Sequence, residues 1–218
     1  MDPKVVSDIC ATAKQVRKTF NNNEADAAAR ESHRMDPIVC SDVLGPITPA
    51  SRSDYRYVAT FMMMKSRYAM VFPLRKKNDV TKAFQKYCHD IKIECGLDVR
   101  VLRSDNGGEY RNAEMTLFCR QKMIKQEVTV PYNPEQNGMT ERLNRTLVEM
   151  TRCMLSESNM DKKYWCEAMM TAVDIRNVLP SASSSISSPF KIVFNRKPRI
   201  DLLRVSGSLC YSHIPKAN

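Results

Sequence analysis

The alternation of apolar and polar positions along residues 35–178 predicts a series of short strands and amphipathic helices. Apolar runs bounded by turn residues predict strands at 38–43, 56–64, 68–74, 99–102 and 127–130. Apolar side chains spaced three and four residues apart predict helices at about 78–94, 109–123, 140–156 and 164–178. The resulting order, β-β-β-α-β-α-β-α-α, is typical of a mixed α/β fold with one central sheet.

Local signals predict where these elements begin and end. The tight link Lys65-Ser66-Arg67 separates the second and third strands and predicts a hairpin between them. Asn78-Asp79 can cap the first helix, and Gly96 is expected to stop it. Residues 131–138 are expected to form a polar loop and 181–188 a serine-rich loop, whereas residues 1–34 lack apolar periodicity and are interpreted as a polar linker.

The helix predicted at 140–156 has two distinct faces. One stripe is apolar and is expected to face the core: Leu143, Leu147, Met150 and Met154. Glu141 falls on the opposite side, near Arg145 and Arg152. A carboxylate beside arginines fits a site in which the arginines contact a phosphate backbone and the carboxylate binds a metal ion. The alternative is a solvated helix face with an ordinary Glu141–Arg145 ion pair.

Composition narrows the class of protein. The chain has 218 residues, of which 43% are hydrophobic, and this suffices for one medium domain. The net charge of +10 suits a polyanionic partner such as DNA or RNA, although a basic surface that serves solubility is the alternative. The eight cysteines form no C-x-x-C pair, so most are expected to be buried reduced thiols in an intracellular protein. No apolar run approaches membrane-spanning length, and no membrane partner is expected.

Three acidic residues stand in contexts that favour metal binding. Asp42 closes one short apolar run, Asp105 follows another just before a Gly-Gly turn, and Glu141 opens an amphipathic helix. Two aspartates at strand ends and a glutamate at a helix start can converge on a pair of magnesium ions, as a phosphoryl-transferring nucleic-acid enzyme requires. Their spacing alone is weak evidence, because the chain has 24 acidic residues.

The segments around these acids resemble the motifs of the integrase core of copia-type retrotransposons, within the broader retroviral integrase group. They are SDVLGP at 41–46, SDNGGEY at 104–110 and PEQNGMTER at 134–142. The likeness covers roughly residues 35–218 and, more weakly, 7–34. It implies an α/β ribonuclease H-like fold, with a five-stranded mixed sheet flanked by helices. It also implies a degenerate zinc-module remnant and linker at 1–34, a catalytic core at 35–200, and the start of a C-terminal extension at 201–218.

The resemblance further implies a chemistry. Asp42, Asp105 and Glu141 would bind two Mg²⁺ or Mn²⁺ ions, and the protein would trim the ends of retroelement cDNA and join them to target DNA. The candidate DNA contacts are Asn106, Asn137, Asn144, Arg145 and Arg152. For the three asparagines, the alternative role is to support the acidic residues through hydrogen bonds. The family implies a homo-oligomer that integrates in the nucleus, with a cytoplasmic particle considered as an earlier location.

The chain departs from the family pattern upstream of the core. Ser7-Asp8-Ile9-Cys10 lies where the family has a closing C-x-x-C, and the three histidines form no ligand-like pair. A zinc site needs about four ligands, so no zinc is expected in this chain. The chain also lacks the family's protease, reverse transcriptase and long C-terminal extension, and it is interpreted as a polyprotein fragment or as a decayed or host-retained copy.

Two other functions fit parts of the pattern. The degenerate zinc module is compatible with a catalytically silent nucleic-acid-binding relic of a retrotransposon integrase. A different ribonuclease H-like nuclease is the third interpretation, and the Asn-Gly contexts beside Asp105 and Glu141 argue against it.

Overall fold

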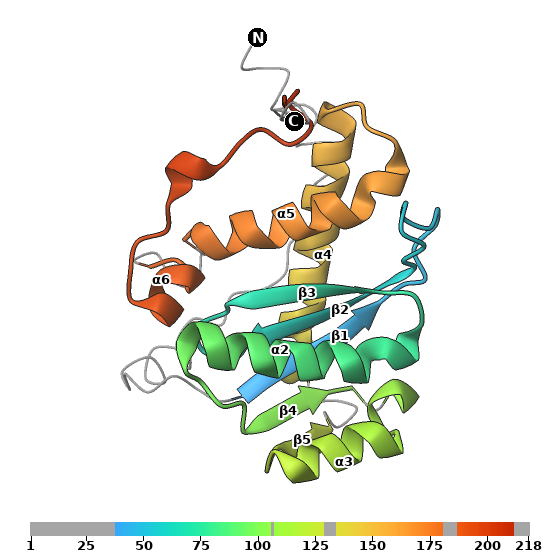
Figure 1. Ribbon diagram of the computed structural model, residues 1–218, viewed down its shortest axis with the longest axis vertical. Coiled ribbons are helices and arrows are strands. Elements are labelled where there is room, and N and C mark those ends of the chain that lie inside the picture. Colours follow the sequence, from blue (N-terminus) through green and yellow to red (C-terminus); the bar gives the residue numbers. More distant parts are fainter. Residues whose placement is uncertain (1–37, 106, 129–133, 181–186, 212–218) are drawn as a thin grey trace, which may run out of the picture.

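The computed structural model describes residues 38–105, 107–128, 134–180 and 187–211, without the side chains of 134–137. Five strands form one sheet in the order β3-β2-β1-β4-β5 (Figure 1). They are β1 Ile38–Leu44, β2 Tyr57–Met63, β3 Ala69–Leu74, β4 Val101–Ser104 and β5 Lys125–Val128. β1, β2 and β3 are antiparallel neighbours, whereas β1, β4 and β5 run parallel. The predicted mixed sheet and the β2–β3 hairpin are confirmed.

Helices cover both faces of this sheet. They are α2 Val80–Cys95, α3 Ala113–Gln121, α4 Pro134–Glu157, α5 Trp165–Val178 and α6 Pro189–Phe194. Short 3-10 turns lie at Lys77–Asp79, Gly108–Tyr110, Lys162–Tyr164 and Ile200–Leu202. In Figure 1, α2 lies in front of the sheet and α4 passes behind it. The predicted order of strands and helices is therefore confirmed.

Strand β2 supplies side chains to two separate cores. Successive side chains of a strand point to opposite faces of the sheet. Ala59, Phe61 and Met63 accordingly join the core beneath α2, which also contains Phe84, Tyr87 and Ile91. Val58 and Met62 join the core beneath α4 and α5, which also contains Leu143, Leu147, Trp165 and Ala172. The even-numbered positions of β2 therefore face α4.

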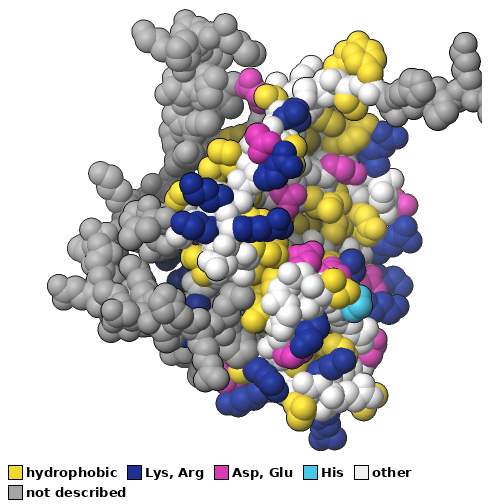
Figure 2. Space-filling model, turned by 60° about the vertical axis from the view of Figure 1, so that its left-hand side comes forward, with side chains coloured by type: hydrophobic (Ala, Val, Ile, Leu, Met, Phe, Trp, Pro, Cys, Tyr) yellow, Lys and Arg dark blue, Asp and Glu magenta, His cyan; other side chains and the backbone are white. Residues whose placement is uncertain are grey.

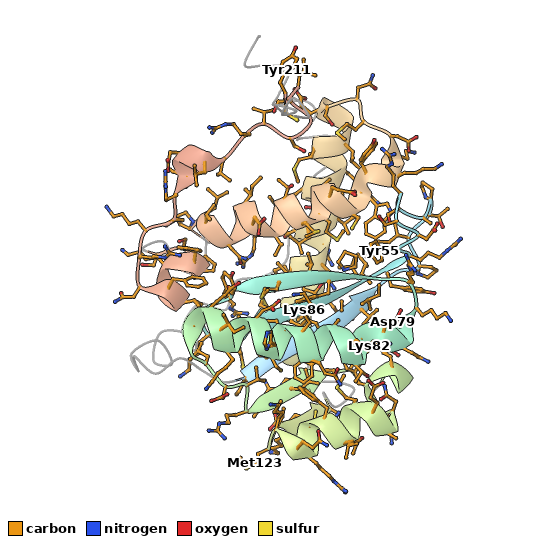
Figure 3. All side chains as sticks on the ribbon, viewed as in Figure 1. Tyr55, Asp79, Lys82, Lys86, Met123 and Tyr211 are labelled. Atoms are coloured by element: carbon orange, nitrogen blue, oxygen red, sulfur yellow. The ribbon has the colours of Figure 1, made fainter. Side chains whose placement is uncertain are left out.

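Two exposed hydrophobic side chains lie far apart in the molecule. Met123 follows α3 and Tyr211 ends the described chain, and both side chains are exposed. Figure 3 places these two residues at opposite ends of the molecule.

Several predicted element boundaries shift along the chain. The strand expected at 127–130 begins two residues earlier, as β5 at Lys125, and residues 129 and 130 lie outside the described part of the chain. The strand expected at 99–102 lies two residues later, as β4 at Val101–Ser104, because parallel pairing with β1 begins at Val101 opposite Ile38. The helix expected at 109–123 is divided into a 3-10 turn and α3. The division falls at Asn112, whose extended backbone and side chain cap α3, with Oδ1 accepting a hydrogen bond of 2.8 Å from the Met115 N–H.

The predicted capping of α2 is right at one end and wrong at the other. Gly96 ends the helix in the left-handed conformation, with φ of 67°, and its N–H donates to the Lys92 carbonyl. Asp79 lies at the start of α2 (Figure 3), but its side chain makes no capping hydrogen bond to that helix. Its carboxylate instead accepts a hydrogen bond of 3.0 Å from the Lys76 N–H and closes the preceding 3-10 turn.

The polar loop predicted at 131–138 is also partly wrong. Residues 129–133 lie outside the described part of the chain, but α4 already begins at Pro134. Proline suits the first turn of a helix because its missing N–H has no partner there in any case. Of the predicted serine-rich loop, 181–186 lie outside the described residues, and Ser188 caps α6 by accepting a hydrogen bond from the Lys191 N–H.

The expectation that most cysteines are buried is only partly right. Among the described residues, Cys40, Cys119 and Cys166 are buried, three others are half-buried, and Cys210 is exposed. No disulfide joins two of these described cysteines. Within the same part of the chain, no helix combines the length and apolar character needed to cross a bilayer. Residues 1–34, with Cys10, lie outside the description, so their assignment stays a prediction.

Candidate active site

Asp42 and Asp105 are brought together by the parallel pairing of β1 with β4. The last residues in register are Cys40 and Arg103. Asp42 lies two residues further along β1, and Asp105 lies two residues beyond Arg103, directly after the end of β4, so continuing the register brings the two aspartates side by side. This arrangement confirms that the two apolar runs end side by side, as expected of parallel neighbours in one sheet.

Both oxygens of the Asp42 carboxylate accept hydrogen bonds. Oδ1 accepts one of 2.8 Å from the Val43 N–H, and Oδ2 accepts one of 2.8 Å from the Asn144 amide nitrogen on α4. Burial raises the pKa of Asp42, and the negative charges of Asp105 and Glu141 raise that pKa further. The two hydrogen bonds act in the opposite direction. Asp105 and Glu141 therefore both lie within electrostatic reach of Asp42.

Asp105 begins a turn that is bonded back to β1. Its Oδ1 accepts a hydrogen bond of 3.2 Å from the Gly107 N–H. The 3-10 turn that follows ends at Tyr110, whose hydroxyl lies 2.7 Å from Ser41 Oγ in a buried hydrogen bond. Burial raises the pKa of the Tyr110 hydroxyl well above its usual range, so it stays protonated. Because Ser41 precedes Asp42 directly, this bond fixes the Asp105 turn beside the strand that carries Asp42.

A fourth acid, Glu109, lies at the same turn. A Cβ atom placed on Gly107 would come within 2.8 Å of Glu109 Oε2 and 3.0 Å of Asp105 Oδ1. The two carboxylates therefore approach each other across the bare Cα of Gly107. Glu109 Oε1 also lies 4.0 Å from Lys77 Nζ, in the 3-10 turn that precedes α2. Glu109 was not among the predicted site residues, although it stands in the SDNGGEY motif, because its side-chain direction depends on the 3-10 turn.

Helix α4 presents its two faces as predicted. Leu143 and Leu147 are buried, and Met150 and Met154 pack partly buried against the same core. Glu141, Arg145 and Arg152 are exposed. Among the described residues, no ion pair joins Glu141 to Arg145, so the simple ion-pair alternative has no support.

The candidate DNA contacts do not all lie on the surface. Asn144 is only 6% exposed and bonds Asp42, so its burial argues against direct DNA contact and fits a supporting role. Arg145 and Arg152 are exposed on α4. Asn106 and the side chain of Asn137 lie outside the described part of the chain. Figure 2 shows Lys and Arg side chains spread over one face of the molecule, so positive charge alone does not mark a DNA path.

The predicted acids are neighbours but are not gathered into one coordination sphere. No three His, Cys, Asp or Glu residues of the described chain lie close enough together to hold a metal ion. The donors are nevertheless carboxylate oxygens, which hard divalent cations prefer. The charges of Asp105 and Glu141 also disfavour the ionised form of Asp42, and a cation between them would remove that repulsion. The chemistry of these side chains therefore fits a divalent cation.

Comparison with known proteins agrees with this fold and these motifs. Residues 32–134 match the integrase core domain family. The chain is 36% identical over 209 residues to the retrovirus-related Pol polyprotein from transposon TNT 1-94 of Nicotiana tabacum. It is 33% identical over 161 residues and 29% identical over 202 residues to those from transposons RE1 and RE2 of Arabidopsis thaliana. These matches cover 96%, 74% and 93% of this chain but span 15%, 11% and 13% of the three relatives.

A solved structure shows the same fold. It is described as the HTLV-2 integrase catalytic core domain in complex with magnesium, in a trimeric form. The likeness has a TM-score of 0.55 at 18% identity and covers 72% of this chain and 95% of that one. It confirms the ribonuclease H-like fold expected from the motifs. Sequence and fold together show that this chain belongs with the integrase core domains of copia-type retrotransposon Pol polyproteins.

Proposed function

We propose that residues 35–200 form the catalytic core of a DNA integrase, a metal-dependent polynucleotidyl transferase. Its reactions would be trimming of the 3′ ends of retroelement cDNA and transfer of those ends into target DNA. The observation that carries this proposal is the arrangement around Asp42. Asp105 directly follows the neighbouring parallel strand β4, and the helix that carries Glu141 bonds directly to Asp42 through Asn144.

The three acids would hold two Mg²⁺ or Mn²⁺ ions. Asp42 and Asp105 would share one ion, and Asp42 and Glu141 the other. When bound, such ions activate the attacking water or 3′-hydroxyl and stabilise the leaving 3′ oxygen. The Glu141 side chain is exposed, so it can turn toward Asp42 without breaking a packed contact. The magnesium named for the HTLV-2 core supports this choice of cation.

Other residues of the proposal act on the DNA itself. Arg145 and Arg152 lie exposed on the face of α4 that carries Glu141, where they would contact phosphate oxygens. Asn106 and Asn137 stay candidate DNA contacts. The cDNA ends and target DNA are the proposed partners, and a homo-oligomer acting in the nucleus, after a cytoplasmic particle, is the proposed assembly. Residues 201–218 would begin a C-terminal extension.

Strand resolution of a branched DNA tests the proposal. The full chain is incubated with Mg²⁺ or Mn²⁺ and a branched DNA that mimics an integration product, and the released strands are quantified. We expect resolution by the unaltered protein and its loss in Asp105→Asn and Glu141→Gln. Asp98→Asn is the matched control, because Asp98 is exposed and bonded to Lys92 outside the site. Equal product from the unaltered protein and Asp105→Asn would contradict the enzymatic proposal.

A catalytically silent, nucleic-acid-binding relic is the second candidate. The observation that favours it is the lack of a gathered three-ligand group among the described residues. Such a protein would release no strand from the branched DNA. It would still bind DNA, with an affinity that falls steeply as salt rises and that does not change in Asp105→Asn.

A further inference from the structure

A buried chain of hydrogen bonds connects β2, α4 and the Asp42 carboxylate. Thr60 Oγ1 donates a hydrogen bond of 2.7 Å to Asn144 Oδ1. Asn144 Nδ2 in turn donates one of 2.8 Å to Asp42 Oδ2. Thr60 and Asn144 are both buried, so neither side chain exchanges these partners for solvent. The Asn144 amide therefore connects strand β2 and helix α4 to Asp42, the candidate metal ligand.

The sheet register explains why these groups meet. Thr60 lies directly opposite Asp42 in the antiparallel pair of β1 and β2. Opposite residues in such a pair project to the same face of the sheet. The even-numbered positions of β2 face α4, as the packing of Val58 and Met62 shows. The face that carries Asp42 and Thr60 is thus the face on which Asn144 lies.

The Asp42 carboxylate and the Thr60 hydroxyl together hold the two ends of the Asn144 amide. An asparagine side chain has a donating nitrogen and an accepting oxygen, which a rotation of the amide exchanges. A hydroxyl that donates to Oδ1 holds the amide with Nδ2 toward Asp42. Without that hydroxyl, the buried Oδ1 would lose its partner, and the amide would be held only by its bond to the carboxylate.

We propose that Thr60 and Asn144 are positioning residues that orient the Asp42 carboxylate for divalent-cation binding. Asn144 lies three residues after Glu141 on α4, so the same bond also sets that helix, and with it Glu141, against Asp42. Each Asp42 oxygen accepts one hydrogen bond from the protein and keeps acceptor capacity for a cation. The inference rests on the proposed function, because it assigns Asp42 to the metal site.

Direct measurement of Mn²⁺ binding tests the inference without an activity assay. The full chain is titrated with Mn²⁺, and unbound Mn²⁺ is quantified by electron paramagnetic resonance. Loss of a residue that orients a metal ligand typically weakens metal binding about 10–100-fold, and we expect Asn144→Ala to fall in that range. Thr60→Val, which keeps the shape and loses the hydroxyl, is expected to weaken binding in the same direction. Thr60→Ser keeps the hydroxyl and is expected to bind Mn²⁺ like the unaltered protein.

Asn177 provides a matched control for the loss of a buried asparagine. Its side chain is 4% exposed and reaches from α5 to β3. There Oδ1 accepts a hydrogen bond of 3.0 Å from the Ala69 N–H, and Nδ2 donates one of 2.7 Å to the Ala69 carbonyl. Asn177→Ala is expected to lower the free energy of unfolding while leaving the Mn²⁺ affinity of the folded protein unchanged.

The outcomes separate this inference from the proposed function. The inference is overturned if the unaltered protein binds Mn²⁺, Asp105→Asn does not, and folded Asn144→Ala and Thr60→Val both bind like the unaltered protein. Equal weakening in Asn177→Ala would overturn it too, because the effect would then be a general loss of stability. Absence of Mn²⁺ binding by the unaltered protein would overturn the proposed function and, with it, this inference.

Discussion

Tyr87 offers a sharp test of the packing beneath α2. Its side chain is 0% exposed, and its ring stacks on Phe61 with centroids 5.0 Å apart. The hydroxyl oxygen is buried and makes no hydrogen bond in the described part of the chain. Burial raises the pKa of this hydroxyl well above its usual value, so it stays neutral. The perturbation that isolates the effect of this oxygen is Tyr87→Phe.

The expected gain follows from the cost of an unsatisfied polar group. Burying a hydroxyl without a partner costs about 1–3 kcal/mol, and its removal leaves a gap of only one oxygen atom. We therefore expect Tyr87→Phe to raise the free energy of unfolding by about 1–2 kcal/mol. For a domain of this size, each kcal/mol shifts the unfolding temperature by about 2–4 °C, so Tm should rise by about 2–8 °C.

Trp165 provides the probe for the measurement. It is the single tryptophan of the chain, and it is buried with its Nε1–H bonded to the Pro49 carbonyl at 3.1 Å. Thermal and urea unfolding of the unaltered protein and Tyr87→Phe would be followed by its fluorescence. The matched control is Tyr110→Phe, which removes the same atom from a hydroxyl bonded to Ser41. That variant should lose about 1 kcal/mol of stability.

The two variants should therefore change stability in opposite directions. An unchanged or lower unfolding midpoint for Tyr87→Phe would refute the reasoning, because the Tyr87 hydroxyl would then have a partner in solution. A gain in both variants would equally refute it, since the Tyr110–Ser41 bond would not stabilise the fold.

Three further predictions concern the site and its surroundings. Gly45 has φ of +129°, and a Cβ there would lie 2.6 Å from the Arg56 carbonyl, so Gly45→Ala should cost about 2 kcal/mol or more in thermal unfolding. A Cβ at Gly107 would lie 3.0 Å from Asp105 Oδ1, so Gly107→Ala should lower strand-resolution activity much more than the unfolding temperature. Burial raises the folded-state pKa of Asp42 above 3.8, so its ionised form destabilises the fold as pH rises through that raised pKa. Without divalent ions, Asp42→Asn should therefore stabilise the protein in urea unfolding at pH 7, and the gain should disappear below pH 3.8, where Asp42 is protonated in both states.

The sequence was sufficient to predict features that depend on local pattern. The apolar stripe of α4 placed Leu143 and Leu147 in the core and Glu141 outside, because helical periodicity determines the faces directly. Gly96 ends α2 as predicted, since a left-handed residue there favours glycine. The proximity of Asp42 and Asp105 was also predictable, because each acid closes an apolar run and the two runs form neighbouring parallel strands.

Features that depend on long-range register were not predictable. The bond from Thr60 to Asn144 requires Thr60 to lie opposite Asp42, but the connection between β1 and β2 does not reveal that pairing. Asp79 has the composition of a helix cap, yet its carboxylate is already bonded to the Lys76 N–H of the preceding turn. The first turn of α4 contains polar residues without apolar periodicity, so the pattern could not distinguish it from a loop.

The order in which the chain is synthesised has a consequence for the central strand. The bonds at the site join residues far apart: Asn144 to Asp42 across 102 positions, Asn144 to Thr60 across 84, and Ser41 to Tyr110 across 69. Translation completes β1 long before α4, so the nascent polypeptide contains both aspartates before Asn144, the amide partner of Asp42, leaves the ribosome. A product of premature termination or proteolysis that ends ahead of α4 would therefore retain Asp42 and Asp105 but contain neither Glu141 nor Asn144.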